Sequence, residues 1–211
     1  MDAKNTPVQH AIVGILSLAL VSIFVFLLQI SWSVAFARVS FILLFLVLII
    51  GPITRLKKPI THSPYLRVPI TWRGEIGIWF FLTALTHFII VLIGSPLSDL
   101  IKMGGGGFSL TNLLGLIALF LGLLLTATSF GKVIVFLGVE SWKWLHHLAY
   151  VIFYLVSAHL VYFQFFSTYG EIGPDWFGYL AVAMAVLVII LQLTAFVLGI
   201  KKHRNEVCPI N

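Results

Sequence analysis

Three histidines lie deep inside apolar stretches, and they are the residues of this chain best suited to chemistry. His87 lies within WFFLTALTHFIIVLI, while His146 and His159 lie thirteen positions apart within WKWLHHLAYVIFYLVSAHLVYF. An ionisable side chain in lipid is costly, and it usually faces a cavity, a partner or a cofactor. Neutral imidazole is a common metal ligand and holds the iron of many hemes. The sequence therefore predicts a membrane-embedded b-type cytochrome.

The elements that must position these histidines are membrane-spanning helices. Of the 211 residues, 60% are hydrophobic and only 9% are charged, whereas roughly 25% are charged in a typical soluble domain. Apolar runs of about 20 residues are long enough to cross a ~30 Å hydrocarbon core as helices. We predict an all-α, polytopic membrane protein, a bundle of six transmembrane helices at residues 11–30, 36–53, 75–94, 110–129, 143–166 and 177–199.

The distribution of lysine and arginine predicts the orientation of this bundle. With six spans, both termini, the loop between spans two and three and the loop between spans four and five share one side. Eleven of the 13 basic residues fall on that side, which leaves Arg38 and Lys102 opposite. Because basic loops stay in the cytoplasm, we predict cytoplasmic termini and a multi-pass protein of the inner (plasma) membrane. No aromatic-interleaved basic groove lies outside the lipid bilayer, so nucleic acid is not expected as a partner.

Helices three and five then run in the same direction, so depths along them can be compared. His87 lies fourteen residues beyond Arg73, and His159 lies sixteen beyond Lys143, which is about 20 to 24 Å for each at 1.5 Å per residue. Two imidazoles at one level on neighbouring helices could bind one iron from opposite faces. We predict that His87 and His159 hold one heme in the outer half of the membrane.

His146 suggests a second heme nearer the cytoplasm, although the partner ligand is less clear. The matching depth on helix three holds Arg73, and a guanidinium is a poor iron ligand but a good partner for a heme propionate. His147 competes with His146 for this role. Thirteen residues place His146 and His159 roughly 140° apart around an ideal helix, so helix five must bend or face two clefts. For each deep histidine, the alternative is a structural hydrogen bond between helices.

Two further residues bear on the chemistry. Glu75 lies near the predicted inner heme, where it could accept a proton from a quinol or pair with Arg73. The single cysteine, Cys208, excludes an internal disulfide and an iron–sulfur cluster ligated by this chain alone.

From Arg38 to about Phe165, the chain resembles a known family in four stretches. These are RVSFILLFLVLIIGPITRL, RGEIGIWFFLTALTHF, LLLTATS and SWKWLHHLAYVIFYLVSAH. The family is the ferric reductase-like transmembrane domain, and the chain is most similar to the heme-binding membrane subunit of the bacterial methionine sulfoxide reductase system.

The resemblance assigns roles to individual residues. The family pattern W-x-x-L-H, with a second histidine thirteen residues later, begins here at Trp142 and places its histidines at His146 and His159. This alignment favours His146 over the histidine that follows it. The third histidine of the family corresponds to His87, and its helix-three arginine corresponds to Arg73.

The resemblance implies electron transfer across the membrane through heme b, from a cytoplasmic flavin or quinol to a redox acceptor protein outside. One heme is expected and a second is compatible, with FMN or quinone as further candidate cofactors. No GxGxxG lies in a βαβ context, so electrons must come from a separate donor such as a cytoplasmic flavin reductase. We divide the chain into an N-terminal segment with the first transmembrane helix (1–35), the heme-binding ferric reductase-like domain (36–200) and a cytoplasmic tail (201–211).

A different class of function remains open. The chain could be an accessory or structural subunit of a larger membrane complex that binds heme or chlorophyll without turnover. The magnesium of chlorophyll also accepts imidazole, so the same histidines would serve. An absorption spectrum before and after dithionite separates these functions, because reduced b heme gives a sharp alpha band and chlorophyll does not.

Overall fold

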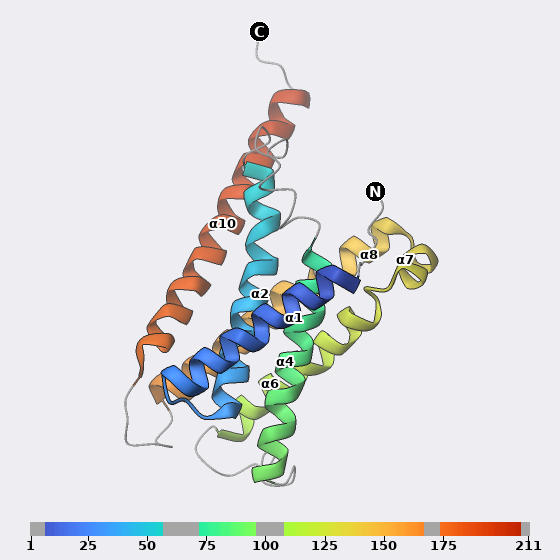
Figure 1. The fold of residues 1–211 in the computed structure, drawn as a ribbon. Coiled ribbons are helices and arrows are strands. Elements are labelled where there is room, and N and C mark those ends of the chain that lie inside the picture. The colour runs from blue at the N-terminus through green and yellow to red at the C-terminus, as the bar shows by residue number, and fades with distance from the viewer. Residues whose placement is uncertain (1–6, 57–71, 96–107, 167–173, 208–211) are drawn as a thin grey trace.

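The computed structural model describes residues 7–56, 72–95, 108–166 and 174–207, and within them the backbone is helical with no β-strand. Lys102, Cys208 and the end of the predicted tail lie outside these residues. A helix satisfies its own backbone hydrogen bonds, which lipid cannot do. The helices are α1 (Pro7–Ser22) with its π-helical continuation η1 (Ile23–Leu27), α2 (Trp32–Leu56), α4 (Arg73–Gly94), α6 (Phe108–Ala127), α7 (Gly131–Leu137), α8 (Val139–Leu145), α9 (Leu148–Val161) with its π-helical continuation η3 (Tyr162–Phe166), and α10 (Trp176–Val207) (Figure 1).

Within the described residues, six stretches of helix are long and apolar enough to cross a membrane, at residues 7–27, 32–53, 73–94, 110–127, 139–166 and 176–201. The predicted all-α bundle of six transmembrane helices is therefore confirmed, and the chain is a multi-pass membrane protein. α1 begins and α10 ends at the same end of the bundle (Figure 1). We call this the terminal end and the opposite end the distal end. α10 continues to Val207, so the predicted tail starts as helix.

The fifth predicted crossing, 143–166, lies within one membrane-spanning stretch, residues 139–166, but a turn interrupts its α-helix. α8 ends at Leu145 and α9 begins at Leu148, so His146 and His147 form a turn between them. The amides of Ala149 and Tyr150 bond to carbonyls three residues back, at 3.2 and 3.0 Å, instead of four. This tighter hydrogen bonding interrupts the α-helical ladder.

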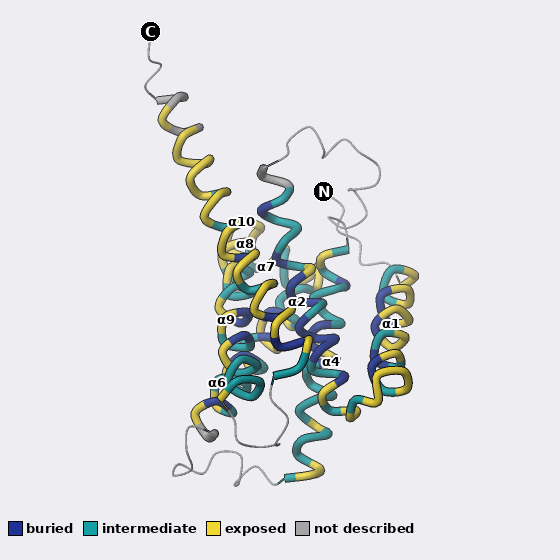
Figure 2. The backbone as a smooth tube through the Cα atoms, turned by 90° about the vertical axis from the view of Figure 1, so that its left-hand side faces the viewer, coloured by how far each residue is buried: buried dark blue, intermediate teal, exposed yellow. Residues whose placement is uncertain are grey.

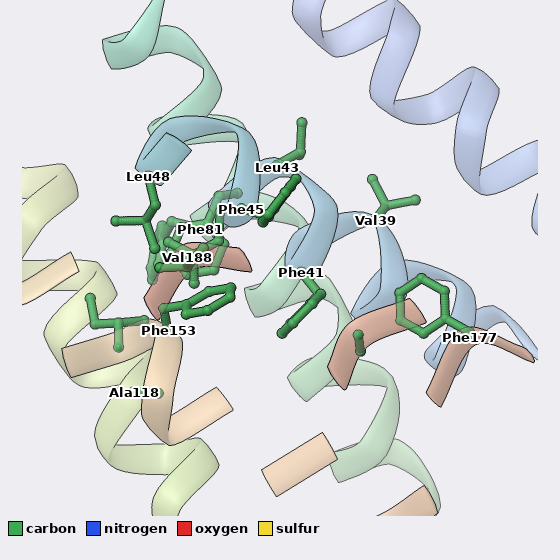
Figure 3. Close-up of a cluster of buried hydrophobic side chains, with 14 of the residues drawn as sticks. Val39, Phe41, Leu43, Phe45, Leu48, Phe81, Ala118, Phe153, Phe177 and Val188 are labelled. Atoms are coloured by element: carbon green, nitrogen blue, oxygen red, sulfur yellow. The ribbon is translucent and has the colours of Figure 1, made fainter. Parts of the chain in front are cut away.

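α2 lies at the centre of the packing and contacts α1, α4, α9 and α10, while α6 packs against α9. Buried residues concentrate where α2, α4 and α9 face one another, whereas α1 and the terminal half of α10 are largely exposed (Figure 2). Phe41 of α2 stacks on Phe153 of α9 with ring centres 5.3 Å apart, and both are fully buried (Figure 3). Such close packing holds helices together in lipid, where hydrophobic burial gives little drive.

An ion pair between a buried arginine and a partly exposed aspartate fastens α10 to α2. The Arg38 guanidinium, on a residue that is 5% exposed, pairs with the carboxylate of Asp175 immediately before α10. Asp175 Oδ1 also accepts the amides of Phe177 and Gly178 at 3.0 and 3.1 Å and so caps the helix. The guanidinium carbon lies 4.9 Å from the centre of the Phe177 ring. The sequence placed Arg38 on the outer side of the membrane, but the structure places its charge inside the bundle. The carboxylate and the aromatic ring compensate for the loss of hydration.

Candidate functional site

His87 lies two turns before the end of α4, and the first turn of α2 holds its ring. Nδ1 of His87 lies 2.9 Å from the carbonyl oxygen of Ser33 and 3.0 Å from the Ser33 hydroxyl. Because a carbonyl oxygen can only accept, Nδ1 must carry the hydrogen. The neutral ring therefore keeps its lone pair on Nε2, and this is the form of imidazole that binds metal ions.

His159 has the same arrangement on α9. Its Nδ1 donates to the carbonyl oxygen of Thr111, in the first turn of α6, at 2.8 Å. Phe163, one turn later, packs edge-on against the imidazole with ring centres 4.9 Å apart. Each of the two histidines thus makes a hydrogen bond to another helix, which was the alternative to a role as a heme ligand. These bonds occupy only Nδ1, so Nε2 is available on each ring.

His87 and His159 both lie toward the distal end of the bundle. Their anchoring carbonyls lie in the first turns of α2 and α6. These are the two histidines that the sequence places at one level on parallel helices, and each leaves its Nε2 available. Their role as iron ligands stays a prediction.

His146 lies in the turn between α8 and α9, about 20 Å along the crossing from His159. Its Nδ1 donates to the carbonyl of Trp142 at 3.0 Å, and the Trp142 ring packs on it with centres 4.2 Å apart. Nε2 lies 3.3 Å from the Ser129 hydroxyl, but that hydroxyl donates its single hydrogen to Leu125 at 2.7 Å. The Nε2 lone pair of His146 is therefore also available.

Donors for an anionic group gather beside His146. Arg73 is the first residue of α4, and Tyr150 lies one turn after His146 on α9. A Cβ atom on Gly51 would lie 3.8 Å from the Tyr150 hydroxyl and 4.0 Å from Nη1 of Arg73, so these two groups approach the same point on α2. A guanidinium and a phenol are suited to bind a carboxylate or a phosphate.

The other two candidate residues differ in burial. His147 is exposed, and its Nδ1 donates to the Lys143 carbonyl at 2.8 Å. His146 is only partly exposed, so burial separates the two neighbouring histidines. Glu75, in the first turn of α4, is 1% exposed.

Sequence reasoning missed both residues that anchor the distal histidines. Ser33 and Thr111 act through their backbone carbonyls, and a backbone acceptor leaves no trace in the type of its side chain. The only available signal was the expectation that a metal-binding imidazole needs a partner at its second nitrogen.

Comparison with known proteins gives one family. The family described as the ferric reductase like transmembrane component matches residues 36–157, which is more than half of the chain. The matched residues contain Arg73, His87, His146 and His147, and they end two residues before His159. No curated protein matches the chain. On the extent of the family match and the six membrane-spanning helices, the chain belongs to the ferric reductase-like transmembrane family.

Proposed function

We propose that this chain is a b-type cytochrome, the heme subunit of a membrane oxidoreductase that moves electrons across the bilayer. Membership of the family supports a membrane electron-transfer component. The observation that carries the proposal is the pair His87 and His159, each held through Nδ1 with Nε2 available. His87 and His159 would be the protein ligands of the heme iron.

Heme, when bound, supplies a one-electron carrier, and the residues of this chain fix its ligands. The carbonyls of Ser33 and Thr111 fix the hydrogen on Nδ1 of each ring and orient the ring, and they increase the basicity of Nε2. Because each ring is anchored on a helix other than its own, it has little freedom to turn away when the charge of the iron changes. A centre with fixed ligands is suited to electron transfer rather than to binding oxygen.

A second heme is proposed at the terminal end, with His146 as its ligand. Support comes from the available Nε2 of His146 and from Arg73 and Tyr150 nearby, which would face the propionates. The two histidine levels are about 20 Å apart along the fifth crossing. Two hemes at these levels would form a relay across the membrane.

The direction of transfer follows from the proposed orientation. In the proposal the chain lies in the inner membrane with both termini in the cytoplasm. Electrons then enter at the terminal end, from a flavin reductase carrying FMN or from a quinol. They leave at the distal end to a redox acceptor protein. The W-x-x-L-H pattern that begins at Trp142 supports the narrower assignment to the heme-binding membrane subunits of methionine sulfoxide reductase systems. In the proposed division, residues 36–200 form the heme-binding domain.

Heme content of the protein purified in mild detergent tests the proposal. The pyridine hemochrome assay would compare wild type with His87→Ala and His159→Ala, and with His10→Ala as a control from the partly exposed face of α1. We expect a sharp alpha band after dithionite, loss of the same heme in both distal variants and full heme in the control. A wild type without heme would overturn the proposal in favour of an accessory subunit, and a chlorophyll spectrum would identify a pigment-binding one.

A further inference from the structure

The imidazole of His159 lies very close to the backbone of α6 at Gly115. A residue with a side chain at this position would come into tight contact with the ring. A Cβ atom on Gly115 would stand 3.1 Å from Cε1 and 3.2 Å from Nδ1 of this ring. Carbon atoms in optimal contact are about 3.5 to 4.0 Å apart. The ring therefore occupies space that any other residue at position 115 would partly fill.

The close approach follows from where the ring finds its acceptor. In an α-helix, the carbonyl of one residue accepts the amide of the residue four positions later. Gly115 is the fourth residue after Thr111, so the Thr111 carbonyl oxygen serves the helix and the imidazole together. An oxygen with two lone pairs can do both. The imidazole must reach this oxygen across the surface of residue 115, and glycine leaves that path open.

The ring has little room to retreat. Phe163, on the same crossing, packs edge-on against it, and the Nδ1 hydrogen bond to Thr111 is 2.8 Å long. Glycine inside a helix is also unfavourable by roughly 0.5 to 1 kcal/mol relative to alanine. Replacing Gly115 by alanine should therefore help α6 as a helix while it displaces the ring.

We infer that Gly115 is a positioning residue for His159, and that through His159 it sets the binding and the reduction potential of the distal heme. The inference rests on the proposed function. The open surface at Gly115 permits the short Nδ1 hydrogen bond, and that bond makes Nε2 a stronger donor to ferric iron. A methyl group at position 115 displaces the ring by a few tenths of an ångström and weakens the bond. The heme is then held less tightly, and its midpoint potential rises because the ferric form loses stabilisation.

The comparison of Gly115→Ala with Gly122→Ala isolates this effect. Gly122 lies on the same helix, and its added Cβ would meet Phe81 at 3.4 Å and Phe80 at 3.6 Å, which are ordinary contacts. Both substitutions change the helix propensity of α6 alike. Heme per chain, the redox titration and the low-spin electron paramagnetic resonance spectrum would be measured on each purified protein. We expect about tenfold weaker heme retention, a higher potential and a shifted spectrum for Gly115→Ala, and wild-type behaviour for Gly122→Ala.

A second measurement avoids dependence on one variant. In a His159→Gly background, added imidazole can occupy the space of the lost ring and bind the iron. Adding Gly115→Ala should lower the apparent affinity for imidazole about tenfold, whereas adding Gly122→Ala should not change it. Equal affinities, or an unchanged potential and spectrum in Gly115→Ala, would overturn the role of Gly115 while leaving the cytochrome intact. A wild type without heme would instead refute the proposed function itself.

Discussion

His87 and Ser33 are 54 positions apart in the chain, yet Nδ1 of His87 lies 2.9 Å from the carbonyl oxygen of Ser33. This contact joins α4 to α2 and fixes which ring nitrogen carries the hydrogen. The same geometry recurs between His159 and Thr111. The two candidate ligands are thus prepared by the backbone, and their chemistry depends on contacts that conservative side-chain changes do not remove.

Ser33→Ala tests which oxygen of Ser33 anchors His87. The substitution removes the hydroxyl, 3.0 Å from Nδ1, but leaves the carbonyl in place. We expect wild-type heme content and a nearly unchanged spectrum, because the carbonyl alone keeps the hydrogen on Nδ1. Loss of the distal heme would show that the hydroxyl donates to Nδ1, which would put the hydrogen on Nε2 and contradict its role as an iron donor.

His146→Ala and His147→Ala should differ sharply. His146 is partly buried against Trp142, whereas His147 is exposed and bonded to the carbonyl of Lys143. We expect His146→Ala to lose the terminal heme and His147→Ala to keep it, by hemochrome content and by the reduced spectrum. The opposite pattern would assign the terminal site to His147.

The ion pair between Arg38 and Asp175 should matter more to stability than an exposed pair. Asp175→Ala leaves a buried guanidinium without its counter-charge and removes the cap of α10, at a cost of up to about 3 kcal/mol. Asp175→Asn keeps an oxygen for the cap and should cost less. Thermal unfolding in detergent, followed by circular dichroism, measures both.

The matched control is Glu140→Ala, in the pair with Lys143 at 2.9 Å, where the side chains are 89% and 56% exposed. Exposed pairs contribute about 0 to 1 kcal/mol. If Asp175→Ala unfolds at the same temperature as Glu140→Ala, the buried pair has no special role.

The hydrogen bond between Tyr154 and Gln192 should contribute little. The Tyr154 hydroxyl donates to Oε1 of Gln192 at 2.6 Å and joins α9 to α10 on an exposed face. Side-chain hydrogen bonds in membrane bundles average about 0.6 kcal/mol. We expect Tyr154→Phe to lower the unfolding temperature only slightly relative to Tyr179→Phe, at an exposed site on α10. A large loss would indicate that α10 depends on this bond.

The orientation can be tested with the natural single cysteine. We expect a membrane-impermeant maleimide to label Cys208 in inverted vesicles and not in right-side-out vesicles, because the side with eleven of the 13 basic residues is predicted to be cytoplasmic. Cys208→Ser is the control without label. Labelling in right-side-out vesicles would reverse the proposed direction of electron transfer.

The six crossings were predictable because they follow from local rules, and the same rules carry the prediction that His87 and His159 share one level. A run of apolar residues of fixed length predicts a helix in lipid, and a constant rise converts sequence spacing into depth. Alternating helix directions then determine which histidines share an end. Each step uses only neighbouring residues and the thickness of the membrane.

The remaining features depend on contacts between distant segments. Asp175 pairs with Arg38 across 137 positions, and no local pattern marks either residue as a partner of the other. Gly115 resembles any small residue of an apolar helix, because its importance depends on a ring that α9 presents to it. The break at His146 was anticipated only as a bend, since a turn of this kind depends on packing and not on a proline or a glycine.

The distal site takes its two imidazoles from the third and fifth crossings and its two carbonyl acceptors from the second and fourth. A nascent chain that ends before α9 lacks one of these four groups. The site is therefore incomplete until α9 has entered the bilayer. Whatever the site binds must therefore be captured late in biogenesis, when most of the bundle is already inserted.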